Sequence, residues 1–249
     1  MKISAIIITL NEERNLPRCL QSLDGIADEI IVVDSHSTDN TQAIAKQHGA
    51  TLIARDWEGY SATKNFANSQ ATHEYILSLD ADEALDDTLR QNILQAKNNG
   101  LTGIYSFNRL TNYCGHWVRH CGWYPDTKTR LFPKDAGQWQ GNYVHEELTF
   151  PAGTKPTHLK GDLLHYSVYT RQEHLERVEK YTDLGAEKLK AKGKKGGPLK
   201  GFFSAIARFF RMYIVKAGFL DGAAGWHICR ISAYAAYLRY RKLAALNQR

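Results

Sequence analysis

The sequence has little that would mark it as secreted, disulfide-bonded or membrane-spanning. Its four cysteines, among 249 residues, are scattered and match no zinc spacing, whereas disulfide frameworks belong to small, cysteine-dense secreted domains. No run of 18 apolar residues predicts a spanning helix. The N-terminus enters an apolar segment without a charged leader and cleavage site. We therefore expect a cytoplasmic protein with free thiols.

A glycine-rich phosphate loop is also missing. The first apolar segment ends in Thr9-Leu10-Asn11-Glu12, which is neither a dinucleotide fingerprint nor a P-loop. A nucleotide bound there would have to be held by side chains and a cation. Nucleic acid is not an expected partner, because the larger part of the chain is acidic and carries no RNA- or DNA-binding motif.

Charge is distributed unevenly along the chain. Residues 1–170 carry 15 Lys+Arg and 20 Asp+Glu, whereas residues 171–249 carry 17 and 6. The two parts also differ in pattern, since residues 171–249 are helical in periodicity throughout. We therefore predict one domain over residues 1–170 and a basic, aromatic helical extension over residues 171–249.

Apolar and amphipathic segments alternate through the first hundred residues. Strands are predicted at residues 3–9, 29–33, 51–54 and 74–79, and helices at 15–23, 41–48, 60–69 and 86–97. Such alternation predicts an α/β fold with a Rossmann-like, mainly parallel sheet flanked by helices. Ligands of these sheets bind at the carboxyl ends of the strands. That rule places Glu12, Asp34 and Asp82 on one rim.

The C-terminal part is predicted to form helices over residues 171–191, 202–218 and 222–245, with a mobile linker at 192–201. Aromatic residues alternate with cations in the second of these helices. This pattern fits an anionic membrane interface. It fits equally well a helix packed on the domain over residues 1–170 or on a second subunit, so peripheral membrane binding and a homo-oligomer both stay open.

Two carboxylates, Asp80 and Asp82, follow an apolar strand. Hard oxygen ligands suit Mg²⁺ or Mn²⁺, cations that also bind diphosphate oxygens. The alternative is an acidic helix N-terminus. At another strand end, Asp34 can accept hydrogen bonds from a base or ribose, or cap the next turn. Lys64 can contact phosphate or base, or be a solvated surface cation.

These residues in this order resemble family 2 glycosyltransferases of the GT-A fold. The likeness rests on Thr9-Leu10-Asn11-Glu12, Asp34-Ser35 with Ser37-Thr38-Asp39, Lys64-Asn65 and Asp80-Ala81-Asp82, and it covers residues 3–170. Residues 123–132, Val144-His145-Glu146 and His165-Tyr166-Ser167 narrow it to the lipopolysaccharide core β-glucosyltransferase group. The resemblance implies inverting transfer from a nucleotide sugar, commonly a UDP-sugar.

The resemblance also implies roles for individual residues. Thr9 and Glu12 would line the nucleoside pocket, Asp34 would hold the base, and Lys64 would approach base or phosphates. Asp80 would lie near ribose and metal, and Asp82 would bind the metal. The chain departs from the family pattern at Ser35, where a second acid is frequent, and at Lys64, where arginine is frequent.

Transfer to an acceptor hydroxyl requires a base, and the metal can offset the charge of the leaving diphosphate. Glu146 and Glu147 are the candidates, and we expect Glu146 to be the base, paired with His145 as in the family. His165 follows an apolar pair at a likely strand end and is the best additional metal ligand, although each histidine alone could be structural.

An aromatic segment is the expected acceptor site. Trp117, Trp123 and Tyr124, with Arg130 nearby, could stack on a saccharide and pair with an anionic glycolipid, or could form a small core under a long loop.

The alternative functions for the chain as a whole are a metal-dependent nucleotidyltransferase, a phosphatase with Asp80 as nucleophile, or a non-catalytic sugar-nucleotide or membrane-binding module.

Overall fold

The computed structural model describes residues 1–141 and 146–248. The chain forms two compact units, Met1–Arg109 with Asp126–His165 and Leu110–Pro125 with Tyr166–Arg249. This division differs from the predicted boundary at residue 170, because the segment Leu110–Pro125 groups with the C-terminal helices. Backbone hydrogen bonds hold it there, from Cys114 N–H to the Val168 carbonyl (2.8 Å) and from Cys121 N–H to the Lys216 carbonyl (3.0 Å).

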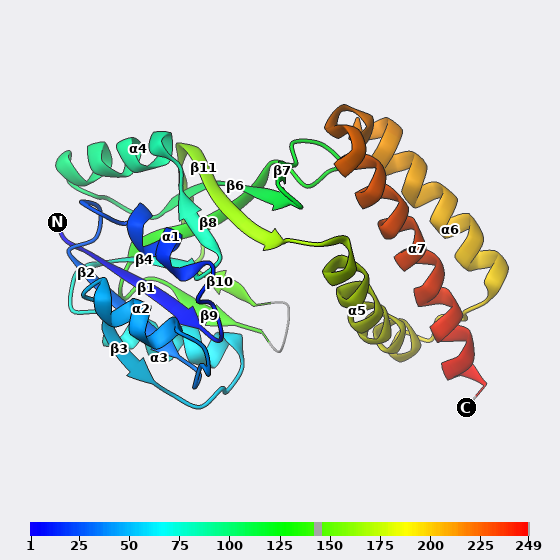
Figure 1. The fold of residues 1–249 in the computed structure, drawn as a ribbon, viewed down its shortest axis with the longest axis horizontal. Coiled ribbons are helices and arrows are strands. Elements are labelled where there is room, and N and C mark those ends of the chain that lie inside the picture. The colour runs from blue at the N-terminus through cyan, green and yellow to red at the C-terminus, as the bar shows by residue number, and fades with distance from the viewer. Residues whose placement is uncertain (142–145, 249) are drawn as a thin grey trace. The chain divides into compact units, whose positions relative to one another are not determined.

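The first unit contains most of the strands and four helices (Figure 1). The elements up to the middle of the chain are β1 Ile3–Thr9, α1 Leu16–Ser22, β2 Glu29–Asp34, α2 Thr41–Gln47, β3 Thr51–Ala54, α3 Tyr60–Gln70, β4 Tyr75–Asp80, β5 Glu83–Leu85 and α4 Asp87–Asn98. The strands that follow are β6 Tyr105–Tyr113, β7 His116–Trp117, β8 Asp126–Pro133, β9 Gln138–Gln140, β10 Glu147–Thr149 and β11 Thr157–Val168. Strands β6 and β11 continue into the second unit, where β7 pairs with β6.

The predicted α/β class is confirmed, with the parallel strands grouped at one side of the sheet. The strand order is β3-β2-β1-β4-β8-β6-β11-β5, and β1, β2, β3 and β4 are mutually parallel. The order runs from β1 toward β2 and β3 on one side and toward β4 on the other. The chain therefore reverses its direction of strand addition between β1 and β4, and the carboxyl ends of these two strands flank the crevice where such sheets bind ligands.

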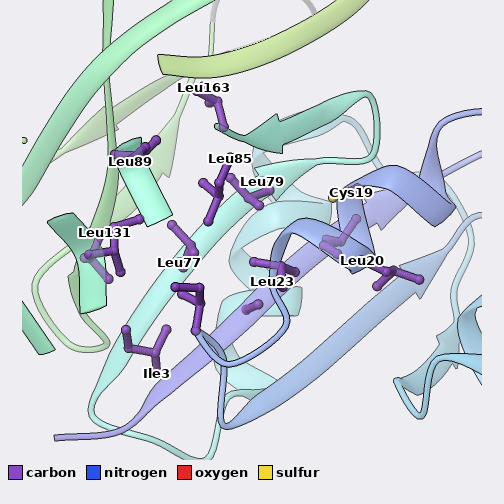
Figure 2. Close-up of a cluster of buried hydrophobic side chains, with 14 of the residues drawn as sticks. Ile3, Cys19, Leu20, Leu23, Leu77, Leu79, Leu85, Leu89, Leu131 and Leu163 are labelled. Atoms are coloured by element: carbon purple, nitrogen blue, oxygen red, sulfur yellow. The ribbon is translucent and has the colours of Figure 1, made fainter. Parts of the chain in front are cut away.

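The parallel strands β1, β2 and β4 are largely buried on both faces because their apolar residues are continuous. In β1, Ile3, Ala5 and Ile7 belong to one hydrophobic cluster, and Ile6 and Ile8 belong to another. This alternation is the two-residue period of a strand covered on both sides. Figure 2 shows the first cluster, in which leucines of α1 and α4 meet those of β4, β5, β8 and β11.

The remaining strands join the sheet in antiparallel fashion. β8 pairs with β4 and β6, and β11 pairs with β5 so that His165 faces Glu83 in register. β9 and β10 form a separate two-stranded ladder. Distant chain segments are thereby brought to the carboxyl end of β4.

The second unit is built on the long helices α5 Arg171–Ala191, α6 Pro198–Phe210 and α7 Gly222–Asn247. Between α6 and α7 lie a π-helical turn, η1 Arg211–Val215, and a 3-10 turn, η2 Gly218–Asp221. Its core includes Tyr113, Cys121, Met212 and Ile228. Within the described ranges, none of the helices combines the length and apolar character needed to cross a membrane.

Two expectations for this unit were wrong in detail. The predicted linker at residues 192–201 already contains the start of α6, where Pro198 occupies the first turn and Gly201 is buried. A Cβ at Gly201 would lie 3.0 Å from Tyr237, so glycine is needed for α6 to approach α7. The predicted helix over 202–218 is also interrupted, because η1 and the left-handed Ala217 (φ 51°) turn the chain toward η2.

Candidate active site

The carboxyl ends of β1 and β2 are joined side by side. Thr9 and Asp34 are register partners, and the Thr9 hydroxyl donates to Asp34 Oδ1 at 3.0 Å. Asp34 also accepts from Ser37 N–H at 2.9 Å, from the Ser37 hydroxyl and from Gln42 Nε2 at 2.8 Å. Because its side chain is fully buried and engaged by these donors, Asp34 organises the rim in this structure. The predicted contact between Asp34 and a base stays a prediction.

The loops after β1 and β2 are linked by hydrogen bonds. Asn11, in a left-handed conformation (φ 55°), receives Thr38 N–H on its side-chain oxygen at 2.8 Å and donates its own N–H to Ser37 Oγ at 2.8 Å. Glu12 N–H donates to Thr41 Oγ1 at 2.8 Å, and its carboxylate accepts from Asn15. Non-glycine residues held at positive φ by such networks are typical of functional rims.

Asp80, at the end of β4, is bound by two buried cations. Its Oδ1 lies 2.7 Å from Lys64 Nζ and its Oδ2 lies 2.8 Å from an Arg130 terminal nitrogen. Burial alone would raise the pKa of Asp80, but Lys64 and Arg130 hold it far below the usual range of a carboxyl group. Asp80 is therefore an ionised carboxylate whose two oxygens are already engaged.

Arg130 is 4% exposed, and its terminal nitrogen also lies 2.9 Å from Glu83 Oε1. Burial opposes the charge, yet Glu83 and Asp80 raise the pKa of Arg130 above its ordinary value. In the structure Arg130 pairs with Asp80 and Glu83, and its predicted contact with the acceptor stays a prediction. The sequence of β8 does not alternate in polarity, so it indicates neither the burial of Arg130 nor its partner.

Glu83 and Arg109 belong to the site and were missed by sequence reasoning. Glu83 is fully buried, accepts Asp80 N–H at 3.0 Å and lies 3.4 Å from Arg109, which also pairs with Asp126 at 2.7 Å. The acidic residues after β4 had the alternative reading of a helix N-terminus, but Asp86 is the N-cap, with its Oδ1 accepting Leu89 N–H at 2.7 Å.

Asp82 and His165 lie close together although they are far apart in the sequence. The Asp82 Oδ2 and His165 Nε2 atoms are 3.2 Å apart, and both side chains are partly exposed. Among the described residues, no group of three or more His, Cys, Asp or Glu is arranged to hold a metal ion. Mg²⁺ and Mn²⁺ commonly use one or two protein ligands together with substrate phosphates. Asp82 and His165 fit that pattern. The two side-chain oxygens of Asp80 already contact Lys64 and Arg130.

Several acidic residues of the site lie near the buried thiol of Cys19. Burial raises its pKa well above the ordinary value, and the nearby carboxylates of Glu83, Asp82, Asp80 and Glu12 raise it further. Its Sγ lies 3.8 Å from the Asp80 carbonyl oxygen. The carboxylates of Glu12, Asp80 and Asp82 therefore all lie within electrostatic range of the Cys19 thiol.

A cleft of about 530 Å³ opens beside this cluster. Its lining includes Asp80, Arg130, Trp139 and Glu146. Lys64, which is 2% exposed, connects two of them because its Nζ lies 3.7 Å from Glu146 Oε1 as well as 2.7 Å from Asp80. The cleft does not include Thr9, Glu12, Asp34, Asp82 or His165 in its lining, and His145, the predicted partner of Glu146, lies outside the described residues.

Trp139, which the sequence groups with Trp117 and Trp123 as a possible saccharide contact, lies at the cleft beside Lys64 and Arg130. Its ring lies 4.4 Å from Lys64 Nζ and 5.5 Å from the Arg130 guanidinium, which are cation–π distances. Its indole Nε1 and the Arg130 Nε are buried and have no hydrogen-bond acceptor within the described part of the chain. Buried donors of this kind point to a ligand rich in acceptor oxygens.

The predicted acceptor residues are divided between the units. Trp117, Trp123 and Tyr124 belong to the second unit and Arg130 to the first. Within the second unit, Trp117 packs edge-on against Tyr166, and Trp123 packs against the cluster of buried apolar residues. Trp123 therefore fits the alternative reading of a small aromatic core under a loop, and the predicted acceptor contacts of Trp117, Trp123 and Tyr124 stay a prediction.

Comparison of the sequence with known families identifies the class of protein to which the chain belongs. The chain belongs to glycosyl transferase family 2, since the sequence model of that family matches residues 4–153. Its Rossmann-like α/β sheet with a helical C-terminal extension is the GT-A fold expected from the resemblance.

Individual relatives extend the likeness to nearly the whole chain. An uncharacterized glycosyltransferase of Rickettsia felis is 32% identical over 97% of this chain and 89% of its own length. A lipopolysaccharide core biosynthesis glycosyltransferase, LpsC of Rhizobium meliloti, is 29% identical over 98% of this chain and 92% of its own length. The likeness therefore includes the C-terminal helices.

Similarity to solved structures is weaker. Glucosyl-3-phosphoglycerate synthase of Mycobacterium tuberculosis, crystallised with Mn²⁺, UDP and glucosyl-3-phosphoglycerate, is 18% identical over 54% of this chain and 57% of its own, with a TM-score of 0.41. That score is too low to support any inference about ligands.

Proposed function

We propose that the chain is an inverting glycosyltransferase that moves a sugar from a nucleoside-diphosphate donor, a UDP-sugar, onto a saccharide or glycolipid acceptor. The lipopolysaccharide core, or another cell-envelope glycan, is the proposed product, supported by the likeness to LpsC. The observation that carries the proposal is the connection Asp80–Lys64–Glu146 at one cleft beside the β1/β4 switch point. Family membership makes this chemistry the natural use of that cleft.

The donor diphosphate is proposed to lie at the carboxyl ends of β1 and β4. Lys64 and Arg130 bring two positive charges to this place, and both are held rigidly by Asp80. The Arg130 Nε and the Trp139 Nε1, which have no acceptor among the residues that the structure describes, add hydrogen-bond donors for phosphate or sugar oxygens. Buried cations with fixed geometry stabilise developing negative charge without reorganising during the reaction.

A divalent cation would be held by Asp82 and His165, the pair that the β5–β11 ladder brings together. When bound, Mg²⁺ or Mn²⁺ acts as a Lewis acid on diphosphate oxygens and lowers the cost of their charge on departure. Asp82 is close in sequence to Asp80, but Asp80 is paired with the side chains of Lys64 and Arg130, so Asp82 is the carboxylate proposed to bind the metal.

Glu146 is proposed as the base for the acceptor. The acceptor oxygen attacks the anomeric carbon of the donor sugar and forms the new glycosidic bond, while its proton passes to a Glu146 carboxylate oxygen. The bond between that carbon and the diphosphate oxygen breaks, and its electron pair leaves with the diphosphate. A single displacement of this kind inverts the anomeric centre.

The experiment combines donor binding with transfer. UDP-sugars are screened by thermal shift with Mn²⁺, because a ligand that binds the native state stabilises it, and the selected donor is then tested with saccharide and lipid-linked acceptors. Glu146→Gln should bind this donor as the wild type does and transfer about 10²- to 10⁴-fold more slowly, the range of general-base contributions. Glu147→Gln, at the neighbouring position in the same cleft lining, is the matched control.

Three results would count against the proposal. Wild-type turnover in Glu146→Gln would remove Glu146 as base, and a product of retained configuration would remove the single displacement. Donor binding without transfer or hydrolysis in the wild type would indicate a non-catalytic sugar-nucleotide module.

A further inference from the structure

We propose that one apolar side of α6, together with η1 and η2, inserts into the interface of an anionic lipid bilayer and anchors the enzyme there reversibly. This apolar side is formed by exposed residues, namely Leu199, Phe203, Ile206 and Phe210 of α6, Val215 of η1 and Leu220 of η2. The proposal concerns the second unit alone and does not depend on the donor, the acceptor or the transfer reaction.

The exposed side chains of α6 form one stripe. Leu199, Phe203, Ile206 and Phe210 are separated by four, three and four residues, which places them on the same side of a helix. The opposite side of α6 packs on α7, where Gly201 lies against Tyr237, and Figure 1 shows these two helices running alongside each other. A helix that is packed on one side would normally present polar residues on the other.

Large apolar side chains of this surface are exposed to water to an unusual extent. Leu199 is 73% exposed, Phe203 65%, Val215 64% and Leu220 61%. Single exposed apolar residues are common, but a contiguous set of large ones marks a surface that is covered in use. Val215 of η1 and Leu220 of η2 follow α6 in the chain and are exposed as well, so the exposed apolar residues are not confined to one helix.

The charges beside this surface indicate what covers it. Residues 192–220 contain seven Lys+Arg and no Asp or Glu, and Lys200, Arg208, Arg211 and Lys216 are exposed. Cations around an inserted apolar helix match the headgroups of anionic lipids. A second copy of the chain fits less well, because a symmetric contact would place the same cations of the two copies near each other.

Insertion would be shallow. Since no described helix can span a bilayer, α6 would lie in the plane of the interface, with its apolar side at the boundary between headgroups and acyl chains. Such binding strengthens with buried apolar area and with anionic lipid, and it weakens as salt screens the cations.

The test is sedimentation of the whole chain with vesicles, without nucleotide sugar. The wild type should sediment with vesicles of phosphatidylcholine and phosphatidylglycerol more than with phosphatidylcholine alone, and added salt should reduce the difference. The double variant Phe203→Ser/Phe210→Ser should lose about 100-fold in partition coefficient, since each large apolar side chain contributes at least about tenfold. Lys200→Gln/Arg211→Gln, which removes two exposed cations beside the stripe, should lose about 25-fold toward anionic vesicles only.

Matched variants separate this surface from exposed apolar residues in general. Tyr181→Ser/Leu184→Ser replaces two exposed residues of α5 and should leave sedimentation unchanged. Circular dichroism confirms that each variant keeps its helices. Wild-type protein that stays in the supernatant with anionic vesicles would overturn the proposal, as would unchanged sedimentation of Phe203→Ser/Phe210→Ser. A lipid-free dimer that this variant dissociates would also overturn it, by giving the surface to a second copy.

Discussion

Replacing Arg130 by methionine should destabilise the protein strongly, because it leaves a buried carboxylate without its main partner. Glu83 is fully buried, and after the substitution it keeps only the Asp80 N–H at 3.0 Å and Arg109 at 3.4 Å. Asp80 would still have Lys64 at 2.7 Å. Removing one partner of a buried ion pair costs about 3–5 kcal/mol of stability. Because Glu83 keeps some contacts, we expect the free energy of unfolding to fall by about 3 kcal/mol.

The double variant Arg130→Met/Glu83→Gln isolates the ionic contribution. With the carboxylate of Glu83 neutralised, no uncompensated charge is buried beside the new methionine, so much of the lost stability should return. Thermal unfolding is the assay, and a loss of about 3 kcal/mol corresponds to about 6–12 °C in a chain of this size. Two results would refute the reasoning, namely a wild-type melting temperature in Arg130→Met, or a double variant whose loss equals the sum of the two single losses.

Two further predictions concern the rim and the second unit. Asp34→Asn replaces an acceptor of Ser37 N–H and Gln42 Nε2 by an amide that offers one oxygen, and should lower stability by about 1–3 kcal/mol in thermal unfolding. A base-contacting role alone would instead weaken donor binding and leave stability unchanged. Burial, with a smaller effect of Arg177, lowers the pKa of His174 to about 4. The unfolded ring, with a pKa of about 6.5, binds protons more readily between these values, so stability present above pH about 6.5 should fall by about 1–2 kcal/mol toward pH 4. His174→Gln should reduce that loss, and equal losses in both proteins would contradict the assignment.

The parallel part of the fold could be predicted because each strand is encoded locally. β1, β2 and β4 are short apolar runs that end at Thr9, Asp34 and Asp80, and each polar residue marks its own strand end. Alignment of these ends then follows from the rules of parallel sheets. Register in the structure bears this out, since Thr9 pairs with Asp34 and Ile8 with Asp80.

The antiparallel part could not be predicted in the same way. Glu83, Arg109 and Arg130 meet through β5, β6 and β8, and the pairings that join them connect segments far apart in the chain. Period and composition show neither that Glu83 and Arg130 are buried nor which charged residues are partners. For the same reason the aromatic residues around Trp123 read equally well as a saccharide site or a core, and the packing in the second unit favours the core.

The central claim is that the carboxyl ends of β1, β2 and β4 form one cation-dependent donor site. Calorimetric titration of UDP with and without Mn²⁺ tests it most directly in three proteins: the wild type, Asp82→Asn, and Asp87→Asn as a matched control at an exposed position of α4. The wild type and the control should bind UDP more tightly with Mn²⁺, and Asp82→Asn should lose at least about tenfold of that enhancement. Equal enhancement by Mn²⁺ in Asp82→Asn and the wild type would contradict the claim.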